Sequence, residues 1–135
     1  MPQNRLSHEF GRNILLAWDG TREAAIALRD SLPLLARAAN VALVSVSSAD
    51  ETAEASSYLV PQTLAWLQRH GVQANAQQHS ALTDIADLLL SCARRMDADL
   101  IVMGGYGHAR LRELVLGGVT RKILERMSVP VLMAH

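Results

Sequence analysis

Cysteine, aromatic residues and net charge are all scarce in this sequence. Its 135 residues contain 1 cysteine and 4% aromatic residues, and 13 basic side chains balance 13 acidic ones. One cysteine excludes a disulfide framework within the chain, so nothing points to an oxidising compartment. A neutral chain without runs of one charge also lacks the electrostatic signature of a nucleic-acid or membrane-surface partner. We therefore expect neither nucleic acid nor membrane as a partner.

Long apolar runs are missing as well. No stretch reaches the roughly 18 apolar residues of a membrane span, and the N-terminal segment MPQNRLSHEF has no apolar core of the signal-peptide kind. These absences predict a cytoplasmic protein. Half of the residues are nevertheless hydrophobic, so a chain of this length can bury a core without metals or disulfides. We expect an N-terminal extension over residues 1–12 and one domain over residues 13–135.

Five short segments predict β-strands. NILLAW, VALVSV and ADLIVM are apolar and rich in branched residues, as in strands covered on both faces. The third segment has thinner apolar content and is predicted to lie at a sheet edge, and the fifth opens at Pro130, which a strand tolerates at its start. In chain order the segments are 13–18, 41–46, 72–78, 98–103 and 129–134.

Helical periodicity fills the gaps between these strands. Thr21 is a predicted N-cap, and Pro33 is expected to kink or split the helix that follows. A polar loop over residues 48–57 leads to a second helix over 61–70, with Pro61 in its first turn and Gly71 at its end.

Apolar spacing predicts which face of each helix is buried. In the helix after Asp84 the acidic side chains Asp84 and Asp87 fall on the polar side, and a last helix is predicted over 119–127. The predicted buried stripes are Ala25, Leu28, Leu32, Leu35, Ala36 and Ala39 in the first helix, and Leu82, Ile85, Ala86, Leu89 and Ala93 in the third.

Strands and helices therefore alternate along the chain. This alternation predicts an α/β fold, with a single doubly wound, five-stranded parallel sheet, Rossmann-like, and with helices on both faces. We expect the strand order 3-2-1-4-5, in which strands 1 and 4 are neighbours. Such sheets bind ligands at the carboxyl ends of the strands, where neighbouring crossovers leave to opposite faces. Two loops fall there: WDGT after the first strand and MGGYGHARLRELVLGGVT after the fourth.

Glycines stand at both ends of the second loop. At Gly104 and Gly107 the missing side chain lets backbone amides approach phosphate oxygens, and Gly117 and Gly118 begin a helix whose first N–H groups point toward an anion. Such a phosphate nest needs no lysine. The same glycines also fit strand-to-helix packing alone.

These residues carry a resemblance to a known family. From ILLAWDGT through DLIVMGGYGHARLRELVLGGVTRKILERMSVPVLMAH, the chain resembles the universal stress proteins over nearly its whole length. Nucleotide-binding members of that family carry the pattern G-x2-G-x9-G-S/T. Gly104, Gly107 and Gly117 match its glycines, whereas Gly118 stands where serine or threonine is expected, and Thr120 matches a threonine common in the motif.

The resemblance implies ATP, with Mg²⁺, as the ligand. It places Asp19 near the ribose, with Gly20 and Thr21 in the same loop, and it places Val46 and Met103 near the adenine. The residues implied around the phosphates are Gly104, Gly107, Gly117, Gly118, Val119 and Thr120.

The resemblance also implies a homodimer formed through the C-terminal strand, residues 129–134. An apolar last strand at a sheet edge leaves backbone groups that a second copy of the chain can pair with about a two-fold axis.

Some of these residues have a purely structural interpretation. Asp19 is also suited to accept local backbone hydrogen bonds at the start of a helix. Trp18 is expected to pack rather than stack on a ligand, and Cys92 is expected to be a small buried thiol.

The charged part of the second loop has no clear assignment. His108 lacks a marked catalytic partner and is interpreted as a solvent-facing loop residue. Arg110 and Arg112 lie beside Glu113 and fit a solvated helical face as well as a triphosphate contact.

Three functions stay open. The leading prediction is a stress-response dimer that binds ATP and acts as a regulator. The alternative is a dimeric scaffold or regulator with a vestigial site, which Gly118 favours because the missing hydroxyl removes a hydrogen bond worth on the order of 1 kcal/mol. Slow ATP hydrolysis is the third, for which the sequence offers no Walker-type lysine and only Asp19 as an obvious carboxylate. Enzymatic activity is therefore left open.

Overall fold

The computed structural model describes residues 11–47, 53–80, 84–104, 122, 123, 125, 126 and 129–134. These residues form a five-stranded sheet in the order β3-β2-β1-β4-β5, and every pair of neighbouring strands is parallel. This confirms the predicted fold class and strand order. The strands are β1 (Asn13–Ala17), β2 (Asn40–Ser47), β3 (Ala74–Ser80), β4 (Leu100–Gly104) and β5 (Val131–Ala134).

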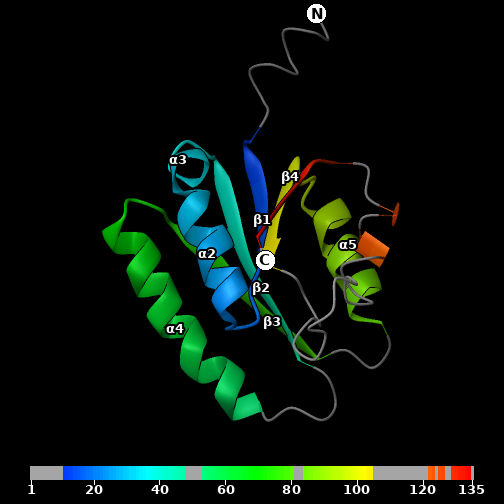
Figure 1. Cartoon of the computed structure of the whole chain (residues 1–135), viewed down its shortest axis with the longest axis horizontal. Coiled ribbons are helices and arrows are strands. Elements are labelled where there is room, and N and C mark those ends of the chain that lie inside the picture. Colours follow the sequence, from blue (N-terminus) through cyan, green and yellow to red (C-terminus); the bar gives the residue numbers. More distant parts are fainter. Residues whose placement is uncertain are drawn as a thin grey trace, which may run out of the picture.

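Helices cover both faces of the sheet (Figure 1). One face carries α2 (Arg22–Asp30), α3 (Leu32–Leu35) and α4 (Ala53–Arg69), and the other carries α5 (Ile85–Arg95). Parallel strands between two helical layers are buried on both sides. Accordingly, β1 and β4 are buried along almost their whole length, as their continuous apolar sequences predict.

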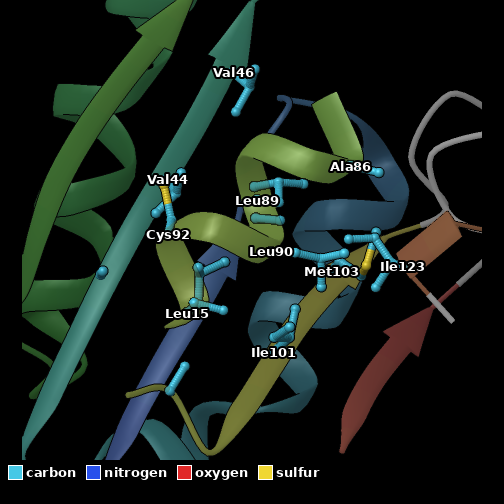
Figure 2. Packing of buried hydrophobic residues seen from close by; sticks show 14 residues of the cluster. Leu15, Val44, Val46, Ala86, Leu89, Leu90, Cys92, Ile101, Met103 and Ile123 are labelled. Atoms are coloured by element: carbon cyan, nitrogen blue, oxygen red, sulfur yellow. The ribbon is translucent and has the colours of Figure 1, made fainter. Parts of the chain in front are cut away.

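The α5 face holds one of two hydrophobic clusters. Side chains of the sheet, among them Val44 and Met103, face Leu89 of α5, and Ile123 packs beside Met103 (Figure 2). Ile123 is fully buried, and the described residues of the last predicted helix are helical. Cys92 lies in the same cluster and is 4% exposed, which confirms the expectation of a buried thiol.

The first predicted helix is split, as Pro33 suggested, but its predicted buried stripe is partly wrong. Ser31 separates α2 from α3, and Pro33 lies in the first turn of α3. Ala25 is exposed because it lies beside the buried face of α2, and Ala36 and Ala39 are exposed because α3 already ends at Leu35. The buried residues are Ala24, Ala27 and Leu28 in α2 and Leu35 in α3.

The start of α4 was also predicted wrongly. The helix begins at Ala53, so Pro61 lies inside it rather than in its first turn. Pro61 is exposed, and on that side of a helix a carbonyl without its usual N–H partner can hydrogen bond to water. The predicted end is confirmed, because the helix stops at Arg69 and Gly71 has a φ of +82°, which glycine adopts without strain.

Both edge strands begin later than predicted, β3 at Ala74 and β5 at Val131. Val72 is outside β3 because its amide donates to the carbonyl of Leu67, at 2.9 Å, and so belongs to the end of α4. At the other edge, β5 begins at Val131, although the carbonyl of Pro130 still accepts from the amide of Ile101 at 3.1 Å. The predicted edge position of the third strand is confirmed.

Candidate functional site

The carboxyl ends of three neighbouring strands meet at one level of the sheet. Ala17 of β1 lies opposite Val44 of β2 and Met103 of β4. Asp19 follows Ala17 by two residues and Gly104 follows Met103 directly, so the two predicted binding loops leave the sheet side by side. Because β1 continues toward β2 and β4 toward β5 on its other side, this is the topological switch point at which doubly wound sheets bind ligands.

Asp19 and Thr21 build the turn that leads from β1 into α2. Asp19 Oδ1 accepts from the amide of Thr21 at 3.0 Å and from its hydroxyl at 2.6 Å. Thr21 Oγ1 in turn accepts from the amide of Ala24 at 3.2 Å, which makes Thr21 the N-cap of α2, as predicted. Gly20, between them, has a φ of +76°. The turn therefore fixes an exposed carboxylate at the helix N-terminus.

Gly104 brings the end of β4 against the first turn of α2. A Cβ at residue 104 would stand 2.5 Å from the nitrogen of Ala24 and 2.6 Å from the carbonyl carbon of Glu23. Both are backbone atoms, which have little room to move. The strand-to-helix packing considered for these glycines is thus real at Gly104, independently of any ligand.

Val46 and Met103 direct their side chains away from this edge. Both belong to the core cluster under α5, where Val46 is 6% and Met103 1% exposed. Figure 2 shows Val46 on β2 and Met103 on β4, both on the side of the sheet that α5 covers. Burial limits what these two residues can offer a ligand to main-chain atoms.

The remaining predicted site residues lie outside the described part of the chain. They are Gly107, Gly117, Gly118, Val119 and Thr120, and the loop residues His108, Arg110, Arg112 and Glu113 lie there too. The structure thus brings together Asp19, Gly20, Thr21, Val46, Met103 and Gly104 at one edge of the sheet.

The sequence analysis did not predict two ion pairs that involve Asp84 and Asp87 at the start of α5. Asp84 caps α5 by accepting from the amide of Ala86 at 2.9 Å, and its other oxygen accepts from Lys122 Nζ. Asp87 accepts from Arg126. The sequence did contain a sign of these ion pairs. Asp84 and Asp87 are three residues apart, and Lys122 and Arg126 are four residues apart, so each pair of like charges lies on one face of a helix. The two pairs join α5 to the residues that flank the buried Ile123.

The pKa of Asp84 is shifted by these contacts. The hydrogen bond from Lys122 is the largest cause and holds the pKa of the Asp84 carboxyl below its ordinary value, with the backbone amide of Ala86 acting in the same direction. Partial burial opposes the shift because it disfavours the charged form. Asp84 is therefore ionised at neutral pH.

No helix among the described residues is both long and apolar enough to cross a membrane.

The strand order, the helices on both faces of the sheet and the switch point between β1 and β4 define the class of protein. It is a doubly wound α/β domain whose predicted binding loops lie side by side at the carboxyl ends of β1 and β4. A model of the universal stress protein family matches residues 11–135. The chain belongs to this family, as the resemblance of its motifs indicated.

Individual relatives match this chain to different extents. Universal stress protein Slr1230 of Synechocystis sp. is 50% identical over 34 residues, which are 25% of this chain and 12% of that protein. Universal stress protein UspA from Lactobacillus plantarum superposes with a TM-score of 0.80 at 15% identity, over 93% of this chain and 99% of that one. A family member from Burkholderia pseudomallei has 27% identity and a TM-score of 0.65, over 90% and 94% of the two chains.

Two further solved structures of the family contain nucleotides. A universal stress protein from Archaeoglobus fulgidus is in complex with dAMP, at 21% identity and a TM-score of 0.64 over 91% of this chain and 97% of that one. Another is in complex with cAMP, at 18% identity and a TM-score of 0.65 over 92% and 97%. At these identities the likeness shows a shared fold, and the ligands belong to those proteins.

Proposed function

We propose that this protein is a cytoplasmic stress-response regulator that binds an adenine nucleotide, ATP with Mg²⁺, at the carboxyl edge of β1 and β4. The observation that carries the proposal is the geometry of that edge, where the Asp19 turn and Gly104 both adjoin the first turn of α2. Doubly wound sheets bind ligands at this position. Family members with the same fold hold dAMP and cAMP.

Asp19 is suited to bind the ribose. Its Oδ1 accepts both hydrogen bonds from Thr21, which fixes the orientation of the carboxylate. Within the described part of the chain Oδ2 takes part in no hydrogen bond, and the side chain is exposed. Oδ2 can therefore accept from a ribose hydroxyl without breaking the turn.

The loop that begins at Gly104 is assigned to the phosphates. Gly107, Gly117 and Gly118 would supply backbone amides, and Thr120 a hydroxyl, as the family motif implies. Mg²⁺ commonly takes one or two carboxylates together with phosphate oxygens and water. Because both oxygens of Asp19 are assigned to Thr21 and the ribose, the ion would be held by phosphate oxygens and water, and it would neutralise phosphate charge.

The alternative function is a dimeric scaffold or regulator whose site is vestigial. It is favoured by the structural tasks of the two best-placed residues, since Asp19 orders the N-cap Thr21 and Gly104 lets β4 pack on α2. Both would be retained without a ligand. Gly118 adds to this reading because it removes the motif's hydroxyl.

Isothermal titration with ATP and Mg²⁺ separates the two functions, together with mass spectrometry of the denatured protein for copurified nucleotide. We expect binding in the micromolar range. Absence of binding at millimolar ATP, with no copurified nucleotide, would favour the scaffold.

The ribose contact is tested by combining a ligand change with a side-chain change. ATP should bind more tightly than dATP in the native protein. Asp19→Asn keeps an oxygen for the bonds from Thr21 but replaces the second acceptor by an amide, so the preference for ATP should disappear. An unchanged preference in Asp19→Asn would remove Asp19 from the site.

Restoring the hydroxyl by Gly118→Ser should tighten ATP binding about five- to tenfold, the effect of one neutral hydrogen bond. Gly107→Val should abolish binding because a branched side chain blocks the backbone approach. Equal affinities in the native protein and both variants would exclude the phosphate nest.

We also propose that the protein is a homodimer that pairs through β5. This strand is hydrogen bonded to β4 on one side, and no described strand covers its other side. Its four residues are only half-buried. A second copy related by a two-fold axis would satisfy the exposed backbone groups and cover this edge.

A further inference from the structure

A cavity of about 360 Å³ lies on the face of the sheet opposite α5, between α2 and α4. These two helices lie side by side there (Figure 1). Its walls are formed by Ala25 and Leu28 of α2 and by Thr63 and Trp66 of α4, and Trp18, directly after β1, lines it from the sheet. This volume is within the range of small-molecule binding sites.

The chemistry of the lining is aromatic. The chain has 2 tryptophans, and although they are 48 positions apart (66 minus 18) both line this cavity. Each is half-buried and packs against the hydrophobic cluster of this face. Indole rings on two walls favour a flat apolar or aromatic molecule, which gains both buried area and ring contacts.

The polar groups around the cavity favour a negative charge on that molecule. Among the described residues that line it, Arg29 is the one ionisable side chain, and Gln62 contributes an amide. Arg29 Nε is 4.0 Å from Asp30 Oδ1, and both side chains are more than half exposed. An ion pair this long and exposed is weak, so Arg29 can still turn to an anionic group at the mouth of the cavity.

The hydroxyl of Ser45 is buried on the face of the sheet that carries the cavity. Ser45 is beside Trp18 in the sheet, because Ala17 pairs with Val44 and the amide of Trp18 donates to the carbonyl of Val44 at 2.8 Å. By strand alternation Ser45 and Trp18 face the same side. Ser45 is 5% exposed, and its hydroxyl has no hydrogen-bond partner in the described structure. Buried hydroxyl groups normally have a hydrogen-bond partner, so the Ser45 hydroxyl is unusual in this respect.

We propose that this cavity binds a compact aromatic carboxylate, with the ring system between Trp18 and Trp66 and the carboxylate at Arg29. Among the described residues, none of those assigned to the nucleotide site lines the cavity. Failure of nucleotide binding would therefore leave this inference untouched, and the reverse also holds.

The test uses naphthoate as the probe and two-dimensional proton–nitrogen NMR of the full chain as the measurement. Because both tryptophans line the cavity, both indole N–H signals should shift and saturate together, with a dissociation constant of order 1 mM or tighter for a ligand of this size. No saturable shift of either signal up to the solubility limit would overturn the proposal.

Ala25→Leu is the matched blocking variant. Ala25 is exposed and lines the cavity, so a leucine there should occupy the space without burying a polar group and should abolish the shifts. Ala65→Leu makes the same change at an exposed position of α4 that does not line the cavity, and it should bind normally. Equal binding by both variants would place the probe elsewhere.

Two further experiments test which charge the cavity prefers and whether the cavity is separate from the nucleotide site. Arg29→Gln should weaken naphthoate about three- to tenfold and leave neutral naphthylmethanol unchanged; naphthylmethylammonium should bind least. Tightest binding of the ammonium would overturn the assignment of an anion. Displacement of naphthoate by ATP would show that the cavity belongs to the nucleotide site and is no second site.

Discussion

Gly104, at the end of β4, lies against Ala24 in the first turn of α2, so close that a Cβ at residue 104 would stand 2.5 Å from the backbone nitrogen of Ala24. This contact joins the two loops of the candidate site, because α2 begins in the Asp19 turn and the glycine-rich loop begins at Gly104. Its first consequence is for stability.

Gly104→Ala should destabilise the fold by about 1–3 kcal/mol, the usual cost of overpacking. The added methyl has to push apart two backbone segments. Thermal and urea denaturation measure the effect. Gly71→Ala is the comparison: nothing lies within 4 Å of its Cβ position, but its φ of +82° disfavours a side chain, so it should lose on the order of 1 kcal/mol through backbone strain alone. A Gly104→Ala protein as stable as the native one would show that the contact can relax.

The Asp19 turn should stabilise α2 through Thr21. Thr21→Ala removes the N-cap and should cost about 1 kcal/mol, whereas Thr21→Ser should cost little. Asp19→Ala should cost less once Thr21 is already alanine, because the 2.6 Å bond between the two side chains is then gone. Urea denaturation of the two single variants and the double variant gives this coupling. Strict additivity would mean that the side-chain bond contributes nothing.

The Asp84–Lys122 pair should make stability depend on pH. The pKa of Asp84 is lowered in the folded state, so the pair's contribution is complete above the unfolded value of about 3.9 and is lost as pH falls through the folded value. Asp84→Asn can still cap α5 but cannot pair with Lys122. Relative to the native protein it should lose about 0.5–1 kcal/mol at pH 7, because the pair is partly exposed.

That difference should shrink below about pH 4, when Asp84 of the native protein takes up a proton. Asp84→Ala should lose more than Asp84→Asn, since it also removes the cap. Denaturant unfolding at several pH values measures both effects. A difference between the native protein and Asp84→Asn that stays constant down to pH 2 would argue against the pair as its source.

The proposed dimer should dissociate when β5 receives a charge. Leu132→Asp should give monomers in light scattering, because a buried carboxylate at a paired edge is costly. Leu64→Asp is the control: both leucines are partly buried and pack against the cluster of the α2 and α4 face, but Leu64 lies on α4. Loss of the dimer in both variants would indicate general destabilisation, and its survival in Leu132→Asp would place the interface elsewhere.

The sequence predicted those parts of the site whose geometry depends on residues close together in the chain. The cap at Thr21 and the hydrogen bonds that Thr21 donates to Asp19 span a few residues, so residue type and spacing were enough to suggest them. The contact of Gly104 with Ala24 bridges two distant segments. Sequence reasoning could name packing as an alternative for this glycine but not its partner.

The errors have the same origin. Pro61 was placed in a first turn because proline ends helices by its local chemistry, yet its exposed position lets α4 continue through it. The predicted stripe failed at Ala25 because the buried face of α2 runs through Ala24 and Ala27, and it failed after the break at Ser31 because α3 ends at Leu35.

By itself, the sequence determined the parallel α/β architecture, its strand order and the family, because alternating apolar periods and a glycine pattern with fixed intervals are local, repeated signals. Only the tertiary structure decided which side chains from distant segments contact one another. It buried Val46 and Met103 under α5, paired Asp84 with Lys122, and brought both tryptophans to one cavity. Such contacts depend on how the layers pack, and no periodicity along the chain encodes which distant side chains will face each other.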